Sequence, residues 1–260
     1  MPSVKLATWN INSIRAREER LLTWLGQEKP DVLCLQETKV EDPGFPTAAL
    51  RKAGYEVATF GQRSYNGVAI ASTQPLGDVV RGLGDDPSDD EARAIAATTH
   101  GMRVVCVYVP NGQDLASDRY PYKLAWFQRL RAYLERTSAP DQPVAVCGDM
   151  NVTPDDRDVW SPEKWQGQIH CSPPERAALA GLAGFGLVDV FRRHNGDDKR
   201  YSWWDYRGVS FFKDQGLRID LIYLTAPLAE RCTGCTIDRN ARKGQDASDH
   251  APVVAVIGPG

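Results

Sequence analysis

Short apolar segments that end on a polar residue recur along this chain, and they constrain the fold more than any other feature of the sequence. VKLATWN ends on Asn10, DVLCLQE ends on Glu37 and VAVCGD ends on Asp149. One such ending is usually a turn, but six of them are not explained by turn chemistry. Because the strand ends of an open α/β sheet converge on one edge, we expect a shared site there. That site would gather Asn10, Asn12, Glu37, Tyr108, Asn111, Asp149, Asn151, Asp220, Asp249 and His250.

The apolar runs and the turn residues between them predict a fold rich in strands. Strands are predicted over Val4–Asn10, Asp31–Glu37, Gly67–Ser72, Ile95–Thr99, Met102–Val109, Pro143–Asp149, Leu187–Phe191, Leu217–Leu224 and Pro252–Ile257. His100-Gly101, between two of them, predicts a hairpin. Helical spacing of apolar residues predicts helices over Arg17–Glu28 and Tyr122–Arg136, and the capping box Ser172-Pro173-Pro174-Glu175 starts a third. This mixture favours a layered α/β fold with mixed sheets over a purely parallel sheet.

Length and composition are those of a globular protein. The 260 residues, 42% apolar and 25% charged, exclude a disordered chain, a fibre and a disulfide-framework miniprotein. No linker or repeat interrupts them, so we expect a single domain over residues 1–260. The N-terminus has no apolar leader, and no run approaches the about 20 apolar residues that a membrane span needs. We therefore expect a cytoplasmic protein without a membrane partner.

Charge is nearly balanced along the chain. There are 31 basic and 34 acidic residues, a formal net charge of −3, which gives no sign of a polyanion partner. One acidic run contains Asp85, Asp86, Asp89, Asp90 and Glu91, and we interpret it as a solvated loop. Outside this run the basic residues slightly outnumber the acidic ones, so a local basic face is possible.

The cysteines fit packing roles. Cys34, Cys106 and Cys147 lie in strand-like apolar runs, where free thiols behave as small hydrophobic groups. Cys232 and Cys235 form a lone CTGC, which has the spacing of half a zinc site or of a redox pair. Because no second C-x-x-C is present, the sequence favours neither of these two functions.

A carboxylate inside an apolar strand is the sharpest chemical signal. Asp220 stands between two apolar residues, where an unpaired charge is costly, and His250 is the partner that a carboxylate would orient and keep protonated. Glu37 and Asp249, with nearby amides, offer hard oxygen ligands that suit Mg²⁺ or Mn²⁺ better than Zn²⁺. A metal beside an imidazolium, with a separate Asp to activate water, indicates a metal-assisted phosphoester hydrolase.

At these residues the chain resembles the exonuclease III family of bacterial apurinic/apyrimidinic (AP) endonucleases, within the endonuclease/exonuclease/phosphatase superfamily. The family blocks occur in order, from Ala7 to Val253, as TWNINSIRAR, LQETKV, YNGVAIAS, YVPNG, GDMNV, YSWWDYRG, GLRIDLIYL and SDHAP. One block alone would be moderate evidence for the family, whereas the complete set in this order is specific to it. The resemblance implies a four-layer α/β sandwich of the deoxyribonuclease I type, with two packed mixed β-sheets flanked by helices.

The resemblance also implies a metal site. Glu37 would be the main ligand of the ion, and Asn10 and Asp249 would lie close to it. Asn12 stands where some relatives have an Asp, which weakens its assignment as a ligand. The cofactor implied by these residues is Mg²⁺ or Mn²⁺.

Roles in the reaction follow from the same resemblance. Asp149 would position and deprotonate the attacking water, and Asn151 would orient Asp149 or the phosphate. His250, paired with Asp220, would hold a non-bridging phosphate oxygen. Further contacts to the phosphate or to the leaving group would come from Tyr108, supported by Asn111.

The resemblance places a pocket for a damaged sugar at the aromatic stretch YSWWDYRGVSFF. Trp203, Leu217 and Ile219 would line a small apolar cup that accepts a baseless or 3′-terminal sugar. His170 lies either on the surface or beside this cup, where its imidazole would hinder an internal abasic site more than a 3′ end. Phosphates of the duplex would meet Arg15, Arg17, Lys39, Arg63, Lys123, Arg207 and Lys213.

Together these features predict a Mg²⁺-dependent DNA repair phosphodiesterase. We expect a monomer that acts on double-stranded DNA with abasic sites, nicks or blocked 3′ ends. Its activities would be 3′→5′ exonuclease, 3′-phosphatase and AP incision, with the 3′-end activities dominating. Two alternatives stay open: another phosphoesterase of the superfamily, acting on inositol phosphates, sphingomyelin or RNA, and a catalytically silent binding protein. The WWDYRG and GLRID blocks favour DNA repair, and the filled catalytic positions disfavour a silent protein.

Overall fold

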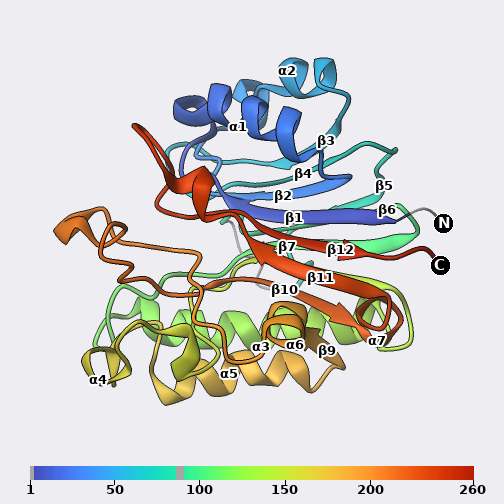
Figure 1. Cartoon of the computed structure of the whole chain (residues 1–260). Coiled ribbons are helices and arrows are strands. Elements are labelled where there is room, and N and C mark those ends of the chain that lie inside the picture. Colours follow the sequence, from blue (N-terminus) through green and yellow to red (C-terminus); the bar gives the residue numbers. More distant parts are fainter. Residues whose placement is uncertain (1–2, 86–90) are drawn as a thin grey trace.

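Two six-stranded β-sheets pack face to face in the computed structural model, which describes residues 3–85 and 91–260 (Figure 1). The first sheet has the order β11 (Cys232–Ile237), β12 (Val253–Ile257), β1 (Val4–Asn10), β2 (Val32–Gln36), β4 (Val68–Ser72), β3 (Glu56–Phe60). The second has the order β5 (Gly77–Arg81), β6 (Ala94–Thr99), β7 (Met102–Tyr108), β8 (Val144–Asp149), β10 (Asp220–Thr225), β9 (Leu187–Asp189). Both sheets are mixed, because β1–β2 and β7–β8 are parallel pairs within otherwise antiparallel sheets.

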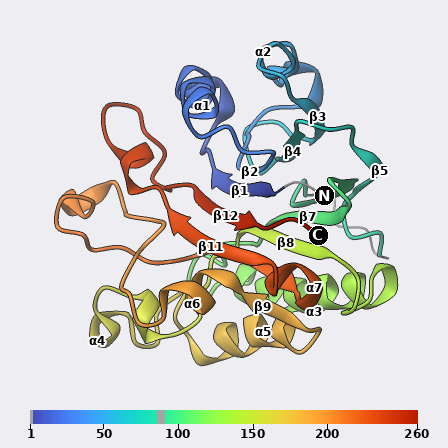
Figure 2. The ribbon, with the colours of Figure 1, turned by 45° about the vertical axis from the view of Figure 1, so that its right-hand side comes forward.

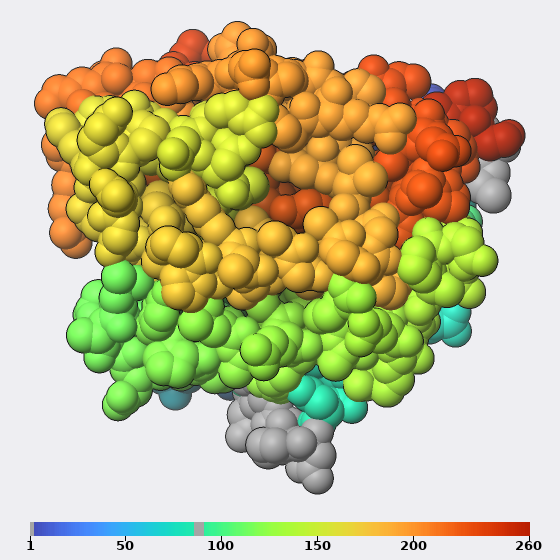
Figure 3. Space-filling model, turned by 90° about the horizontal axis from the view of Figure 1, so that it is seen from below, coloured from blue at the N-terminus to red at the C-terminus, as the bar shows by residue number. Residues whose placement is uncertain are grey.

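Helices cover the outer face of each sheet, so the predicted four-layer sandwich is confirmed (Figures 1 and 2). The first sheet is covered by α1 (Ile14–Glu28) and α2 (Thr47–Lys52). The second sheet is covered by α3 (Arg119–Thr137) and α5 (Pro173–Ala183), whose green and yellow-to-orange residues make up part of the face in Figure 3. Shorter helices are α4 (Pro162–Trp165), α6 (Val190–Asn195) and α7 (Ala226–Ala229).

The main core lies between the two sheets. Alternate side chains of both sheets interdigitate there, as expected for residues on the inner faces of packed strands. The thiols of Cys34, Cys106 and Cys147 are fully buried in this layer, which agrees with their predicted packing role. Cys232 and Cys235 join the same core from β11 and are both buried, so the CTGC segment packs as an edge strand.

All nine predicted strands are present, with two boundary corrections. Leu187–Phe191 is a strand only to Asp189, because the Asp189 side chain accepts the Arg192 N–H and caps α6 from Val190 onward. Leu217–Leu224 is a ladder only from Asp220, and Leu217 forms isolated bridges with Val159 and Trp203 instead. The His100-Gly101 hairpin is present, with φ of 49° and 71°, which fits a tight turn between β6 and β7.

Three strands were not predicted, and each lies at a sheet edge. β3, β5 and β11 are three of the four outermost strands, and most of the residues in β3 and β5 are not buried. An edge strand exposes more of its residues, so it lacks the continuous apolar run that reveals a central strand. The helix predicted from Arg17 starts earlier, at Ile14, and Arg17 has a non-helical φ of −129°.

The acidic run, predicted to be a solvated loop, forms ion pairs with the protein at both of its ends. Asp85 pairs with Arg129, and Glu91 pairs with Arg93 and Arg119, so these two charges are compensated by the protein. Asp86, Asp89 and Asp90 lie outside the described residues. Among the described residues, no helix combines the length and the apolar character that a membrane crossing requires.

Candidate active site

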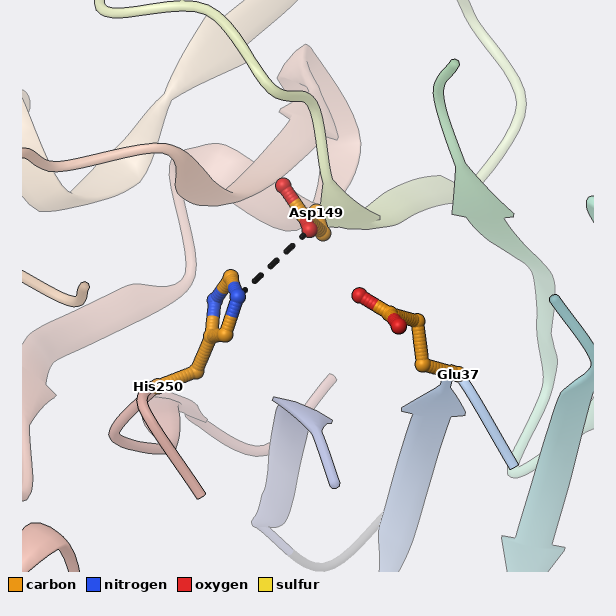
Figure 4. A group of neighbouring side chains, drawn as sticks. All are labelled: Glu37, Asp149 and His250. Carbon is orange, nitrogen blue, oxygen red and sulfur yellow. Dashed lines mark ion pairs between the residues drawn. The ribbon is translucent and has the colours of Figure 1, made fainter. Parts of the chain in front are cut away.

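The predicted strand-end residues meet at one edge of the two sheets. Glu37 follows β2, Asp149 ends β8, and His250 lies just before β12, and the three side chains point toward one another (Figure 4). Asp220 starts β10 directly opposite Asp149, because β8 and β10 are antiparallel and pair these two residues. Gly148 precedes Asp149 at a φ of 154°, where a Cβ would lie 1.8 Å from the Val107 carbonyl oxygen. Only glycine therefore allows β8 to approach β7 so closely at the site.

Glu37, Asp149 and His250 gather at the candidate metal site, where Glu37 is the expected ligand. One ligand atom each from Glu37, Asp149 and His250 lie within 4.8 Å of one another. The Asn10 amide donates to Glu37 Oε1 and to Asp149 Oδ2, both at 2.9 Å, so Asn10 holds the two carboxylates together. The Lys39 ammonium lies 2.8 Å from Glu37 Oε2 and compensates part of the charge. Lys39 was predicted to contact DNA, but in this structure it is bound inside the site.

Asp249 and Asn12 lie beside this group rather than within it. The Asn12 amide donates to Asp249 Oδ1 at 2.9 Å, and Trp203 Nε1 donates to Asp249 Oδ2 at 3.0 Å. Burial opposes the charge on Asp249, but nearby His250 and these two hydrogen bonds outweigh it and lower the pKa of Asp249. Asp249 therefore carries a negative charge between the metal site and the predicted sugar pocket.

The donor chemistry of this site fits a hard divalent cation. Four carboxylates gather here, from Glu37, Asp149, Asp220 and Asp249, and ion pairs link them to Lys39 and His250. Burial, reinforced by Asp220 and Glu37, raises the pKa of Asp149 to about 7 in spite of the opposing charge of His250. Carboxylate and amide oxygens without a thiol suit Mg²⁺ or Mn²⁺.

His250 and Asp220 form the predicted buried pair. Asp220 Oδ2 lies 2.8 Å from His250 Nδ1, and His250 Nε2 lies 3.8 Å from Asp149 Oδ2 (dashed line in Figure 4). Burial disfavours the imidazolium, but the carboxylates of Asp220 and Asp149 outweigh burial and raise the pKa of His250 to about 10. His250 is therefore a cation at neutral pH, with Nε2 directed at the site.

Asn151, Asn111 and Tyr108 form the other wall. Asn151 has a left-handed φ of 51°, and its N–H donates to Asp149 Oδ1 at 2.9 Å. The Asn111 amide donates to Asn151 Oδ1 at 3.2 Å, so the two asparagines orient each other. The Arg93 guanidinium lies 4.8 Å from the centre of the Tyr108 ring. Burial and the carboxylates of Glu37 and Asp149 raise the pKa of Tyr108, so its phenol remains protonated.

A buried ion pair behind this wall was missed in the sequence. Lys123 and Glu175 are both 0% exposed, and the Lys123 ammonium also donates to the carbonyl oxygens of Asn111, at 3.0 Å, and Asn151, at 2.7 Å. The prediction that Lys123 contacts a DNA phosphate is therefore wrong, because its charge is used inside the protein. Helical spacing could have revealed it, since Lys123 lies four residues before Phe127 on the buried face of α3.

His170 lies beside the predicted sugar pocket and not on the surface. It is 6% exposed, and its ring centre is 6.4 Å from that of Trp165 and 6.3 Å from that of Trp203. Its ring Nδ1 lies 2.6 Å from the Asn151 carbonyl oxygen, and its backbone N–H donates to Glu175 Oε1. Burial, with the nearby charge of Lys123, lowers the pKa of His170 to about 4, so the ring is neutral.

The apolar residues of that pocket are only partly accessible. Leu217 is 0% and Ile219 2% exposed, and both pack in a small cluster against the half-buried Trp203. The accessible pocket wall is therefore Trp203, with Leu217 and Ile219 behind it.

Among the remaining predicted DNA contacts, Arg17 donates to the Asn12 carbonyl oxygen and to Tyr206. Exposed side chains are those of Arg15, Arg63, Arg207 and Lys213.

Comparison with known proteins places this chain among nucleases. Residues 7–250 match the model of the endonuclease/exonuclease/phosphatase family. The chain is 37% identical to the exodeoxyribonuclease III of Haemophilus influenzae, over 97% of this chain and 99% of that protein.

Two solved structures share its fold closely. An AP endonuclease from Archaeoglobus fulgidus has a TM-score of 0.95 and 42% identity, over 98% of this chain and 99% of that one. A 3′ phosphatase from Neisseria, bound to a product DNA hairpin, has a TM-score of 0.93 and 39% identity, over 97% and 98% of the two chains.

Proposed function

This chain belongs to the endonuclease/exonuclease/phosphatase family and is a DNA repair nuclease, and we propose that it hydrolyses phosphoesters at 3′ ends and abasic sites of double-stranded DNA with Mg²⁺. We further propose that residues 1–260 act as one domain and as a monomer. The observation that carries this proposal is the meeting of Asp149, His250 and Asn151 around one position.

The residues of this chain would divide the reaction between them. Asp149 would accept the proton of the attacking water, since its pKa of about 7 makes it a suitable base at neutral pH. The His250 imidazolium and the Asn151 amide would hold phosphate oxygens and stabilise the charge that develops on them. The Tyr108 phenol, protonated and close to both carboxylates, would donate a hydrogen bond to the phosphate or to the leaving oxygen.

Mg²⁺ would be held by Glu37, with Asn10 and Asp249 nearby. When bound, it would supply Lewis-acid stabilisation of the phosphoryl charge. Asn10 already binds both carboxylates, so it would keep the ligands in place before the ion arrives. Lys39, paired with Glu37, would balance the charge of the site in the meantime.

We also propose that the 3′-end activities dominate over AP incision. His170 supports this, because its buried ring lies next to Trp203, where an internal abasic sugar would have to enter. Entry of an internal sugar requires it to leave the duplex, whereas a 3′ terminus has a free end and needs less room. The Neisseria relative described as a 3′ phosphatase is consistent with this preference.

Asp149→Asn tests the reaction. The change removes proton acceptance with almost no change in volume, so turnover should fall at least 100-fold, roughly the contribution of general-base catalysis. Cleavage of labelled abasic, 3′-phosphate and undamaged duplexes, with Mg²⁺ and with EDTA, measures it. Binding of the same duplexes in EDTA should survive. A variant that loses binding as much as turnover would contradict the role of Asp149 as a base.

His170→Gly tests the activity ratio. The change removes the ring beside Trp203 and should raise AP incision relative to 3′-phosphate removal on matched duplexes. It also removes the contact with the Asn151 carbonyl, which affects both activities and therefore cancels in the ratio. An unchanged ratio would show that His170 does not restrict the pocket.

A further inference from the structure

A buried arginine with no ion-pair partner among the described residues lies in the short helical turn Arg239–Arg242, after β11. Arg242 is 9% exposed, and its guanidinium contacts the rings of Tyr206, at 4.9 Å from the ring centre, and Phe211, at 5.1 Å. Across residues 3–85 and 91–260, no carboxylate forms an ion pair with it, and its Nε has no hydrogen-bond partner. Its terminal guanidinium nitrogens are not among the buried atoms without a partner, so they are accessible and can bind an anion from outside the protein.

Arg242 lines a cavity that opens between two projecting loops. The cavity has a volume of about 460 Å³, and its wall includes Tyr206, Val209, Phe211, Phe212, Arg239 and Arg242. Residues 205–214 (orange) and 239–246 (red) project from the same end of the molecule in Figures 1 and 2. Phe212 is 85% and Val209 55% exposed, so an apolar surface faces solvent at the mouth.

The charges around this cavity are cationic on balance. Lys243 also lines the wall. Arg239 forms an ion pair with Asp214, with 3.3 Å between Nε and Oδ1, so its charge is partly compensated. Asp205 is the acidic residue of the lining, and its carboxylate already accepts the Arg207 N–H at 2.8 Å. Burial, with the repulsion of Arg17 and Arg20, lowers the pKa of Arg242, while Tyr206 and Asp249 act in the opposite direction.

The cavity is connected to the catalytic centre through one side chain. The Tyr206 hydroxyl lies 3.5 Å from the Asn12 amide nitrogen and 3.1 Å from an Arg17 nitrogen. Asn12 in turn donates to Asp249 at 2.9 Å. A ligand that rests on the Tyr206 ring would therefore contact a side chain whose hydroxyl reaches Asn12, the neighbour of Asp249.

We propose that this cavity binds one unpaired nucleotide of the DNA next to the cleavage site, with its phosphate on Arg242 and its base against Phe212 and Val209. An anion alone would leave the exposed aromatic wall unused, and an apolar ligand alone would leave the guanidinium unpaired. Aromatic rings beside cationic groups are the means by which proteins bind single-stranded DNA. The base must be unpaired, because a paired base stays stacked inside the duplex. The proposal rests on the proposed function, since it assumes that the chain binds DNA.

The test uses 2-aminopurine, whose fluorescence falls when it stacks on an aromatic ring. In duplexes with a recessed 3′ end, 2-aminopurine is placed as an unpaired base at the junction. It stands either at the 3′ terminus of the recessed strand or in the other strand at the same position. In control duplexes 2-aminopurine is base-paired. Binding is measured in EDTA, so that no cleavage occurs. We expect quenching of an unpaired probe in at least one of the two positions and tighter binding than to the paired control.

Two variants locate the effect. Phe212→Ala and Arg242→Met should each weaken binding of the unpaired duplex by about tenfold, a typical loss for one stacked base, and change binding of the paired duplex by less than about twofold. Val80→Ala and Arg51→Met, on β5 and α2 away from the cavity, are matched controls. Phe212 is exposed, so its variant should fold even if Arg242→Met does not.

The outcomes separate the two proposals. Equal weakening of paired and unpaired duplexes by both variants would make Arg242 an ordinary phosphate contact and overturn the nucleotide site. Wild-type protein that binds paired duplex but shows no quenching would also overturn it, and the DNA function would stand. Failure of the wild-type protein to bind any of these duplexes would overturn the proposed DNA function itself.

Discussion

Removal of one member of the buried pair Lys123–Glu175 should be among the most destabilising single changes at the active site. In Lys123→Met the Glu175 carboxylate remains 0% exposed without its cation, and the Asn111 carbonyl loses its donor. Breaking a buried pair by removing one partner costs about 3–5 kcal/mol. The free energy of unfolding should fall by about that amount.

The double variant Lys123→Met/Glu175→Gln separates this charge effect from packing. It leaves no uncompensated charge, and the Gln oxygen can still accept the His170 N–H. Its loss should be about 1–3 kcal/mol, the cost of the unpaired Asn111 carbonyl. The double variant should thus be more stable than Lys123→Met alone.

Guanidinium unfolding followed by tryptophan fluorescence measures all three proteins, with Glu175→Gln completing the cycle. Arg51→Met, on the exposed surface of α2, controls for loss of a basic side chain. A Lys123→Met variant within about 1 kcal/mol of the wild type, or additive losses in the double variant, would refute the reasoning.

Three further predictions follow from the site. Glu37→Ala should lower turnover by orders of magnitude with an unchanged unfolding free energy, and excess Mg²⁺ should restore it only in part; near-normal turnover at low Mg²⁺ in a titration would contradict the metal role of Glu37. DNA affinity should fall by a factor of 10 or more between about 50 and 200 mM salt, because Lys and Arg contacts to phosphates release counterions; a flat salt dependence in anisotropy measurements would count against phosphate contacts. The pKa of His170 is about 4 when folded and about 6.5 when unfolded, so its contribution to stability is complete above pH 6.5 and is lost as the pH falls toward 4. Wild type should lose about 3 kcal/mol more than His170→Gln over that range in unfolding experiments, and equal losses would place the pKa of His170 near its ordinary value.

The strand-end site was predictable because the sequence shows both which charged residue needs a partner and where along the strands the polar residues lie. Asp220 lies within an apolar run, so its need for a partner follows from the residue types alone, and His250 lies at 2.8 Å from it. The central strands β2, β8 and β10 are fully buried and consist mostly of apolar residues, which explains why they were found. Edge strands such as β5 lack this signal, because most of their residues face solvent.

Side chains that act across the fold were harder to predict. The prediction that Lys123 contacts a DNA phosphate requires its charge to lie at the surface, whereas Lys123 lies on the buried face of α3. Glu175 was identified as part of a capping box, and it is one, but the same carboxylate also binds Lys123. Lys123 meets Glu175 because α3 packs against α5. The residues around each helix do not show which helices pack together, so this partner could not be predicted from local sequence.

The Asn151 carbonyl accepts from two residues at once, Lys123 and His170, which come from distant parts of the chain. One of these donors supports the asparagine that we propose binds the phosphate, and the other lies beside the proposed sugar pocket. Under the proposed roles, substrate preference and catalytic competence are therefore not independent traits in this molecule. A natural replacement of His170 that widened the pocket would also relax the backbone of Asn151, which has a φ of 51°. Lineages that shift from 3′-end cleaning toward abasic-site incision would then be under selection to restore that lost bond elsewhere, so divergence at these positions should occur in correlated steps.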